Sequence, residues 1–552
     1  MSRRQVLAAA GGTGLLAATA GSANAATTRR ARAAAGGGTP EQIHLTWGEN
    51  PTNSIVVSWA SPGQSVRARV RIGQRIIPAE ARSYTDGISG ETVWTYHAPV
   101  GGLRPGATYV YNVTADNDAN AADPFSATFR TAPEGRAPFR FTSFGDLATP
   151  NTHWVLSYGQ SAYAVAAVEA FQPLFHLLNG DLCYADLNPT QQPDVWRDFG
   201  NNNQASAANR PWMPCPGNHE VEFGNGPQGF TSYLTRYTLP DNQVPGLAGR
   251  WYSFRVSSVL FVSLDADDVV YQDAGAFVAG PAALTPAAST GNPPIEPGTS
   301  FYIRGYSGGA QTAWLERTLA AGRADQSVDW IIVQMHQCAA SSSATGNGSD
   351  LGIREEWLPL FDRYQVDLVL SGHDHDYERS FPVRGADANV GKEVATGGAV
   401  NTLRPHPVTT TDSGVFDTSQ GTVHLILGCG GTDANLDDYG TDSADGKRQA
   451  KVFTRADRPA LTSAPDVYAR AAADAVEDAI WSAKRDTSTG YGIAVFDVDP
   501  DPEGFSGHTS ITVTHYHAVG ADPVNPANGA KGAPTPDYTE FETFRLVRPR
   551  SS

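Results

Sequence analysis

Long apolar runs and positive charge are both scarce in this chain. No stretch of about 20 apolar residues occurs, which argues against a membrane-spanning helix. The 40 Lys and Arg residues face 57 Asp and Glu residues, giving a net charge of −17. Because an acidic body repels phosphate backbones and anionic lipids at long range, neither nucleic acid nor a membrane surface is an expected partner.

Cysteine is also rare. The chain has four cysteines, namely Cys183, Cys215, Cys338 and Cys429. Their spacing excludes a paired CxxC metal site, and three disulfide pairings are possible if the protein is exported. Buried free thiols remain an equal alternative.

The N-terminus reads as a targeting segment. Arg3 and Arg4 precede a mildly apolar run, Val6–Ala20, and Ala23-Asn24-Ala25 offers a small-residue cleavage site. We therefore predict a twin-arginine signal peptide over residues 1–25 and export to the cell envelope or outside the cell. Residues 26–39 are small and Gly-rich, which is typical of a flexible linker.

Two domains follow the linker. Short alternating segments such as Gln42–Trp47 and Ser54–Trp59 predict a fibronectin-like β-sandwich over residues 40–132. Residues 138–550 then mix strand-like runs with longer helical ones, such as Ala164–Phe171 and Ala313–Ala321. This pattern favours an α/β domain.

Five apolar runs each end in residue types that commonly bind metals in proteins. Because strands of an α/β sheet share one carboxyl edge, these residues are expected to meet in one crevice. Carboxylate, amide, phenol and imidazole groups suit hard or borderline cations, and a pair of cations needs a bridging carboxylate. The clusters are Gly145-Asp146, Gly180–Tyr184, Gly217–Glu220, Val333–His336 and Gly372–His375.

These five ordered clusters resemble the motifs of the purple acid phosphatases, and Pro40–Trp47 resembles that family's fibronectin-like opening. The resemblance implies a catalytic domain of two mixed sheets flanked by helices. It also implies phosphate monoester hydrolysis by in-line attack of a metal-bound hydroxide. The small-molecule phosphate ester would be captured by the metal ions, since the chain itself is acidic.

The resemblance also implies roles for individual residues. The first metal, Fe(III), would be bound by Asp146, Asp181, Tyr184 and His375. Asp181 would bridge to a divalent ion (Zn, Mn or Fe) held by Asn218, His336 and His373. His219 would lie outside the metal shell, where it orients the ester and protonates the leaving group.

One departure from the family concerns substrate preference. No histidine lies between Gln337 and Gly372, where the plant enzymes have two substrate-facing ones. Phosphate contacts there are expected from hydroxyls or amides, in Cys338–Ser343 or Asn347–Asp350. The alternative activity is that of a phosphodiesterase acting on nucleotides or phospholipid head groups with the same metal centre, and the difference would lie in pocket walls built by residues 272–312 and 337–350. A non-catalytic binding protein is a third hypothesis, which the complete ligand set disfavours.

Two other patterns could be mistaken for sites. Gly305-Tyr306-Ser307-Gly308-Gly309 matches the nucleophile elbow of serine hydrolases. It follows a Pro-rich segment, so we expect the glycine-rich entry of a helix. Asp265, Asp267 and Asp268 end another apolar run. The resemblance gives them no metal, and a polar strand exit is expected.

Overall fold

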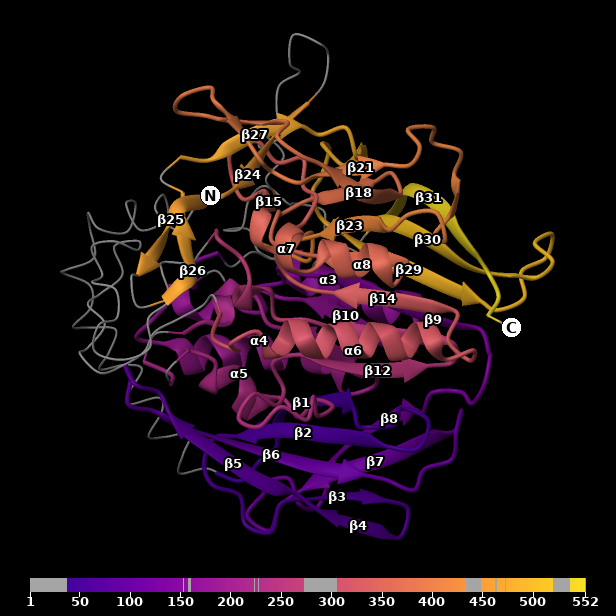
Figure 1. Ribbon diagram of the computed structural model, residues 1–552. Coiled ribbons are helices and arrows are strands. Elements are labelled where there is room, and N and C mark those ends of the chain that lie inside the picture. The colour runs from indigo at the N-terminus through magenta and orange to yellow at the C-terminus, as the bar shows by residue number, and fades with distance from the viewer. Residues whose placement is uncertain are drawn as a thin grey trace.

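The computed structural model describes residues 37–551 apart from 152, 157–159, 223, 227, 273–304, 433, 435–447, 462–463, 472 and 520–536. The predicted signal peptide and the linker up to residue 36 lie outside these ranges. The mixture of β-sandwich and α/β layers expected from the sequence is present (Figure 1).

The N-terminal part is a sandwich of two four-stranded antiparallel sheets. One sheet contains β1 (Glu41–Trp47), β2 (Ile55–Ser61), β6 (Thr92–Val100) and β5 (Glu80–Thr85). The other contains β4 (Arg75–Pro78), β3 (Arg69–Ile72), β7 (Thr108–Thr114) and β8 (Phe125–Arg130). Aromatic side chains fill this part of the core; for example, the rings of Trp59 and Tyr96 stack with centroids 5.7 Å apart.

Two seven-stranded mixed sheets form the centre of the larger part. The first contains β11 (Trp212–Cys215), β10 (Phe175–Asn179), β9 (Phe139–Phe144), β29 (Gly492–Asp499), β30 (His508–Val519), β31 (Asp537–Pro549) and β22 (Val415–Asp417). The second contains β12 (Tyr252–Val256), β13 (Val259–Ser263), β14 (Trp330–Gln334), β16 (Leu368–Ser371), β23 (Val423–Leu427), β17 (Tyr377–Ser380) and β28 (Ser482–Arg485).

Helices cover these sheets. In Figure 1, α6 runs beside β14, and the contacts place α3 against β29 and β30. The helices are α3 (Gln160–Phe171), α4 (Gln192–Ala207), α5 (Thr231–Arg236), α6 (Ala310–Ala324), α7 (Leu351–Glu356) and α8 (Leu358–Arg363).

Shorter strands complete the larger part. A five-stranded sheet contains β15 (Ser349–Asp350), β24 (Gln449–Phe453), β27 (Ala475–Asp478), β19 (Gly391–Glu393) and β20 (Ala399–Val400). Two strand pairs are β18 (Val383–Asp387) with β21 (Arg404–Pro407), and β25 (Arg455–Leu461) with β26 (Ala464–Arg470).

The two large sheets pack through aromatic rings. Phe141 and Phe175 of the first sheet meet Phe261 of the second edge-on, with centroids 5.2 and 5.1 Å away. All three side chains are buried, and each contributes about 1.5–3 kcal/mol by leaving water. The four cysteines all lie in the described part and are buried free thiols, which decides the alternative that the sequence left open.

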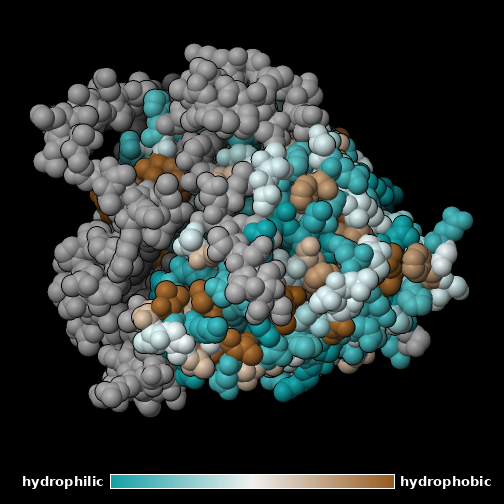
Figure 2. Space-filling model, turned by 90° about the horizontal axis from the view of Figure 1, so that it is seen from above, coloured by the Kyte–Doolittle hydropathy of each residue, from teal (hydrophilic) through white to brown (hydrophobic). Residues whose placement is uncertain are grey.

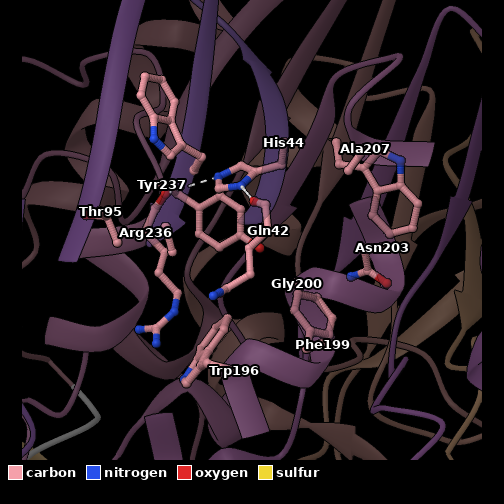
Figure 3. A pocket seen from close by; sticks show the side chains of 13 residues that line it. Gln42, His44, Thr95, Trp196, Phe199, Gly200, Asn203, Ala207, Arg236 and Tyr237 are labelled. Atoms are coloured by element: carbon pink, nitrogen blue, oxygen red, sulfur yellow. Dashed lines mark hydrogen bonds between the residues drawn. The ribbon is translucent and has the colours of Figure 1, made fainter. Parts of the chain in front are cut away.

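The sandwich is joined to the α/β part by polar bonds around a small pocket (Figure 3). The His44 ring bridges two backbone oxygens, 2.9 Å from that of Gln42 and 3.1 Å from that of Arg236. Thr46 donates to the carbonyl oxygen of Thr238 at 2.6 Å. Trp196 and Phe199 line the pocket from α4. These contacts fix the sandwich against α4 and the segment that follows α5.

The described part of the face seen in Figure 2 is mainly polar. In the view of Figure 2 the described residues are mainly hydrophilic, and hydrophobic side chains form small separate patches. Within the described ranges, no helix has the length and hydropathy needed to cross a membrane.

Candidate metal centre

The predicted ligands follow strands of both large sheets. In the first sheet β9, β10 and β11 run parallel, and in the second β14 and β16 run parallel. The carboxyl ends of these strands lead into the five clusters identified in the sequence. The crevice is therefore shared by two sheets, and each sheet supplies part of the ligand set.

One group of side chains surrounds Asp146. Its Oδ1 lies 3.0 Å from the hydroxyl of Tyr184 and 3.3 Å from Nε2 of His375. The same His375 nitrogen lies 3.2 Å from the Tyr184 hydroxyl. All three residues are buried. Carboxylate, phenol and imidazole thus converge from three separate loops.

A second group surrounds Asp181. Nε2 of His336 lies 3.0 Å from Asp181 Oδ2, and Nδ1 of His373 lies 3.1 Å from the same His336 nitrogen. One ligand atom from each of the three residues falls within 4.8 Å of the others. Three buried donors around one point have the spacing and chemistry to hold a cation.

Asn218 supplies an independent indication of a ligand. It opens the short 3₁₀ turn η2 (Asn218–Glu220) and is 4% exposed. Its Oδ1 has no hydrogen-bond partner among the described residues. Because a buried amide oxygen left unsatisfied costs about 1–3 kcal/mol, a cation at this oxygen would account for its position.

The electrostatics of the second group favour positive charge. Burial raises the pKa of the Asp181 carboxyl, but the neighbouring His336 and His219 outweigh burial and hold that pKa below its usual range. Burial lowers the pKa of His336, but Asp181 and Asp146 raise it above its usual value. The carboxylates therefore attract positive charge at the point where a cation would bind.

The backbone at these loops is unusual. Asp146, Asp181, Tyr184 and His373 have φ values of 56°, 49°, 60° and 73°. Non-glycine residues in this left-handed region are strained by about 1–3 kcal/mol each, and such strain gathers at functional sites. A Cβ at Gly217 would lie 2.3 Å from Asp181 Oδ1. Only glycine leaves room there for the carboxylate.

His219 lies beside this cluster. Its Nδ1 contacts both oxygens of Asp186, at 2.8 and 3.0 Å, and its Nε2 lies 3.8 Å from Asp181 Oδ2. The backbone N–H of His219 also donates to Asp181 Oδ1 at 2.9 Å. Asp186 therefore turns Nε2 of His219 toward Asp181.

Two residues that support the predicted ligands, Asp186 and Glu220, were not predicted from the sequence. Asp186 lies in the 3₁₀ turn η1 (Ala185–Leu187), just beyond Tyr184, and closeness to that motif was its only signal. Glu220 belongs to a quoted motif but received no role. Its two carboxylate oxygens accept the backbone N–H groups of Leu182, at 2.9 Å, and Gly217, at 2.8 Å. It ties two ligand loops together.

The two patterns set aside as decoys have structural contacts. Ser307 donates to Asp268, and α6 begins soon after, at Ala310. Asp265 accepts the backbone N–H of Asp267, which closes the turn η3 (Ala266–Asp268). Gln311 holds the same turn through the carbonyl oxygen of Asp265, at 2.9 Å. These are helix-entry and strand-exit contacts.

The residues present fit a pair of cations. The seven predicted ligands provide carboxylate and amide oxygens, one phenol and three imidazoles, and none of them is a thiol. This donor set suits hard or borderline cations. The unpartnered oxygen of Asn218 and the converging atoms of Asp181, His336 and His373 agree with that reading.

Comparison with known proteins places the chain in a family. Residues 40–131 match the model of the purple acid phosphatase N-terminal domain, and residues 139–377 match that of the calcineurin-like phosphoesterases. An uncharacterized protein of Mycobacterium tuberculosis is 40% identical over 526 residues, which span 92% of this chain and 87% of that protein.

Two plant proteins are also similar. The Fe(3+)-Zn(2+) purple acid phosphatase 12 of Arabidopsis thaliana is 24% identical over 367 residues, or 64% of this chain and 67% of that protein. The solved structure of purple acid phosphatase PPD1 from yellow lupin (Lupinus luteus) seeds aligns with a TM-score of 0.59 at 17% identity. The alignment covers 93% of this chain and 75% of that one. At this identity the structural match supports the fold alone.

The fold and the site together define a metal-dependent phosphoester hydrolase. Within that class the chain belongs to the purple acid phosphatase family, as the sequence motifs indicated. A non-catalytic binding protein is the weaker reading, because the family is enzymatic and the donor set is complete.

Proposed function

We propose that this chain is an exported acid phosphatase that hydrolyses small phosphate monoesters at a centre of two metal ions. The observation that carries the proposal is the placement of His219. Its imidazole is held by Asp186 on one side and faces Asp181 on the other. A proton donor therefore stands beside the metal cluster, as leaving-group protonation requires.

We assign the metal ligands as the family resemblance implies. Asp146, Tyr184 and His375 would hold Fe(III), because a phenolate prefers a hard trivalent ion. Asn218, His336 and His373 would hold a divalent ion, and Asp181 would bridge the two. Zinc, manganese and iron are the candidates for the divalent ion, and the Arabidopsis relative named as a Fe(3+)-Zn(2+) enzyme supports this pairing.

When bound, the two cations would supply Lewis acidity toward the phosphoryl oxygens and an acidified water as nucleophile. The chain's own residues would donate the proton and position the ligand loops. Asp186 stabilises the protonated imidazole of His219, so that its Nε2–H can be donated to the oxygen of the departing alcohol. Glu220 keeps the loops of Asp181 and Asn218 in register through its two backbone bonds.

The proposal extends to organisation and location. We take residues 40–132 as a fibronectin-like domain and residues 138–550 as the catalytic domain. The twin arginines, Arg3 and Arg4, support a signal peptide over residues 1–25 and export by the twin-arginine machinery. Replacing both arginines by lysine should keep the enzyme in the cytoplasm; unchanged export would contradict this route.

Rates on matched monoester and diester substrates test the reaction. We expect the purified protein to hydrolyse a nitrophenyl phosphate monoester faster than the corresponding diester at acidic pH. Asp181→Asn should abolish both activities, since it removes the bridging charge. A faster diester reaction would assign the alternative, a phosphodiesterase. Full activity of the Asp181→Asn variant would refute the metal centre.

A further inference from the structure

The ring of His373 presents its two nitrogens to different surroundings. Nδ1 lies 3.1 Å from Nε2 of His336 and belongs to the group around Asp181. Nε2 faces away from that group and contacts the side-chain amide of Gln272. If His373 is a metal ligand, Nδ1 is therefore its coordinating atom, and Gln272 touches the other side of the ring.

The contacts of these rings show which nitrogen faces the ligand group. Nδ1 of His336 lies 2.7 Å from the carbonyl oxygen of Asn179, and only a protonated nitrogen can make that bond. Nε2 of His336 points the other way, 3.0 Å from Asp181 Oδ2 and 3.1 Å from Nδ1 of His373. Nε2 of His373 points out of the group, to the side-chain nitrogen of Gln272.

A cation on Nδ1 determines what the other nitrogen requires. A neutral imidazole bound through Nδ1 carries its proton on Nε2, which then needs an acceptor. The Oε1 atom of Gln272 has no hydrogen-bond partner among the described residues, and the residue is 7% exposed. Half a turn of the amide would bring this oxygen to Nε2, exchanging the bond from the amide nitrogen to Asn347 Oδ1 for one accepted from Nε2–H.

We propose that Gln272 is the positioning residue of His373, whose amide accepts from Nε2–H and so fixes the tautomer that binds the divalent ion through Nδ1. This role rests on the metal centre of the proposed function. Gln272 belongs to none of the five clusters that the sequence identified.

Hydrogen bonds fix the backbone of Gln272 beside His373. Asp350 accepts the backbone N–H of Gln272 at 2.8 Å and that of Tyr271 at 2.8 and 3.0 Å. The Gln272 amide also donates to Oδ1 of Asn347 at 3.1 Å, and Asn347 donates to the carbonyl oxygen of His373. Asn347 thus contacts the backbone of His373, and Gln272 contacts its ring.

The serines and the asparagine of this segment have different partners. The N–H and hydroxyl of Ser342 both donate to Glu378, at 2.8 and 2.6 Å. Ser341 also donates to Glu378. The amide of Asn347 instead contacts the backbone of His373.

The test compares metal retention in three variants of the full chain. Gln272→Leu keeps the size of the side chain but offers no acceptor, whereas Gln272→Glu always accepts. Gln311→Leu is the control, because Gln311 is also buried but bonds to Asp265 and Asp268. Each protein is titrated with a chelator while its iron and divalent metal are quantified and its visible absorption is recorded.

We expect Gln272→Leu to hold the divalent ion about 10- to 100-fold more weakly, with iron and the visible band unchanged. Gln272→Glu should bind at least as tightly as the unmodified chain, and Gln311→Leu should not differ from it. Equal retention in Gln272→Leu would overturn the proposal. If that variant does not fold, a tenfold loss in Gln272→Glu would overturn it instead.

The unmodified protein separates this inference from the proposed function. If it takes up no metal and hydrolyses no ester, the proposed function itself fails. If it loads two metals and turns over substrate while Gln272→Leu retains its divalent ion, only the role of Gln272 is refuted.

Discussion

Asp186→Asn tests whether His219 acts as the acid of the reaction. The two side chains are 12% and 6% exposed, so water screens their interaction little. Unit charges about 4 Å apart attract with about 4 kcal/mol at an effective dielectric constant of about 20. Asparagine can still accept from Nδ1–H, so we expect about half of this stabilisation, about 2 kcal/mol, to be lost when the imidazole is protonated.

The loss should depend on the leaving group. About 2 kcal/mol corresponds to about a 30-fold lower rate, and it applies where the departing oxygen needs a proton. We therefore expect about a 30-fold decrease in kcat on an alkyl phosphate and little change on a nitrophenyl phosphate. The assay is the ratio of the two rates, measured with metal content confirmed as unchanged.

Asp198 provides the control for Asp186. Asp198 accepts bonds from Asn151 and Trp154, at 2.7 and 2.6 Å, and contacts none of the predicted ligands. Asp198→Asn should leave the ratio of rates unaltered. An equal loss on both substrates in Asp186→Asn would show that Asp186 supports the loop and does not govern proton transfer.

Three further variants probe the ligands and the pH dependence. Tyr184→Phe should retain two metals but lose the visible band, as recorded by absorption and elemental analysis. Gly217→Ala places a Cβ 2.3 Å from Asp181 Oδ1, so kcat should fall by about 100-fold. Burial raises the pKa of Glu222 from 4.5 to about 7. Because the folded state holds this proton more tightly than the unfolded chain, the free energy of unfolding falls by about 3 kcal/mol as the pH rises from 4.5 to about 7. Glu222→Gln should remove that slope in denaturant titrations; an unchanged slope would assign it to other groups.

The position of the five clusters after buried strands could be predicted because its signal is local. The strand β9, for example, runs from Phe139 to Phe144 and leads directly into Gly145-Asp146. Parallel strands then bring the clusters to one edge. The helix expected over Ala313–Ala321 is α6, which begins earlier, at Ala310 after the cap residue Gly309, and ends later, at Ala324.

The supporting residues could not be predicted because their roles depend on the folded arrangement. Glu220 meets Leu182 across 38 positions, and Gln272 meets His373 across 101. No periodicity links such pairs. The strand order also could not be read from the sequence: β9 and β10 belong to one sheet, and β14 and β16 belong to the other.

The most direct test of the two-metal assignment is the visible absorption spectrum of the purified protein, recorded with quantification of iron, zinc and manganese on the same sample. We predict a purple band from Tyr184 bound to Fe(III), with one iron and one further metal per chain. A protein that carries neither iron nor a second metal after expression in metal-supplied medium, and remains colourless, would contradict the assignment.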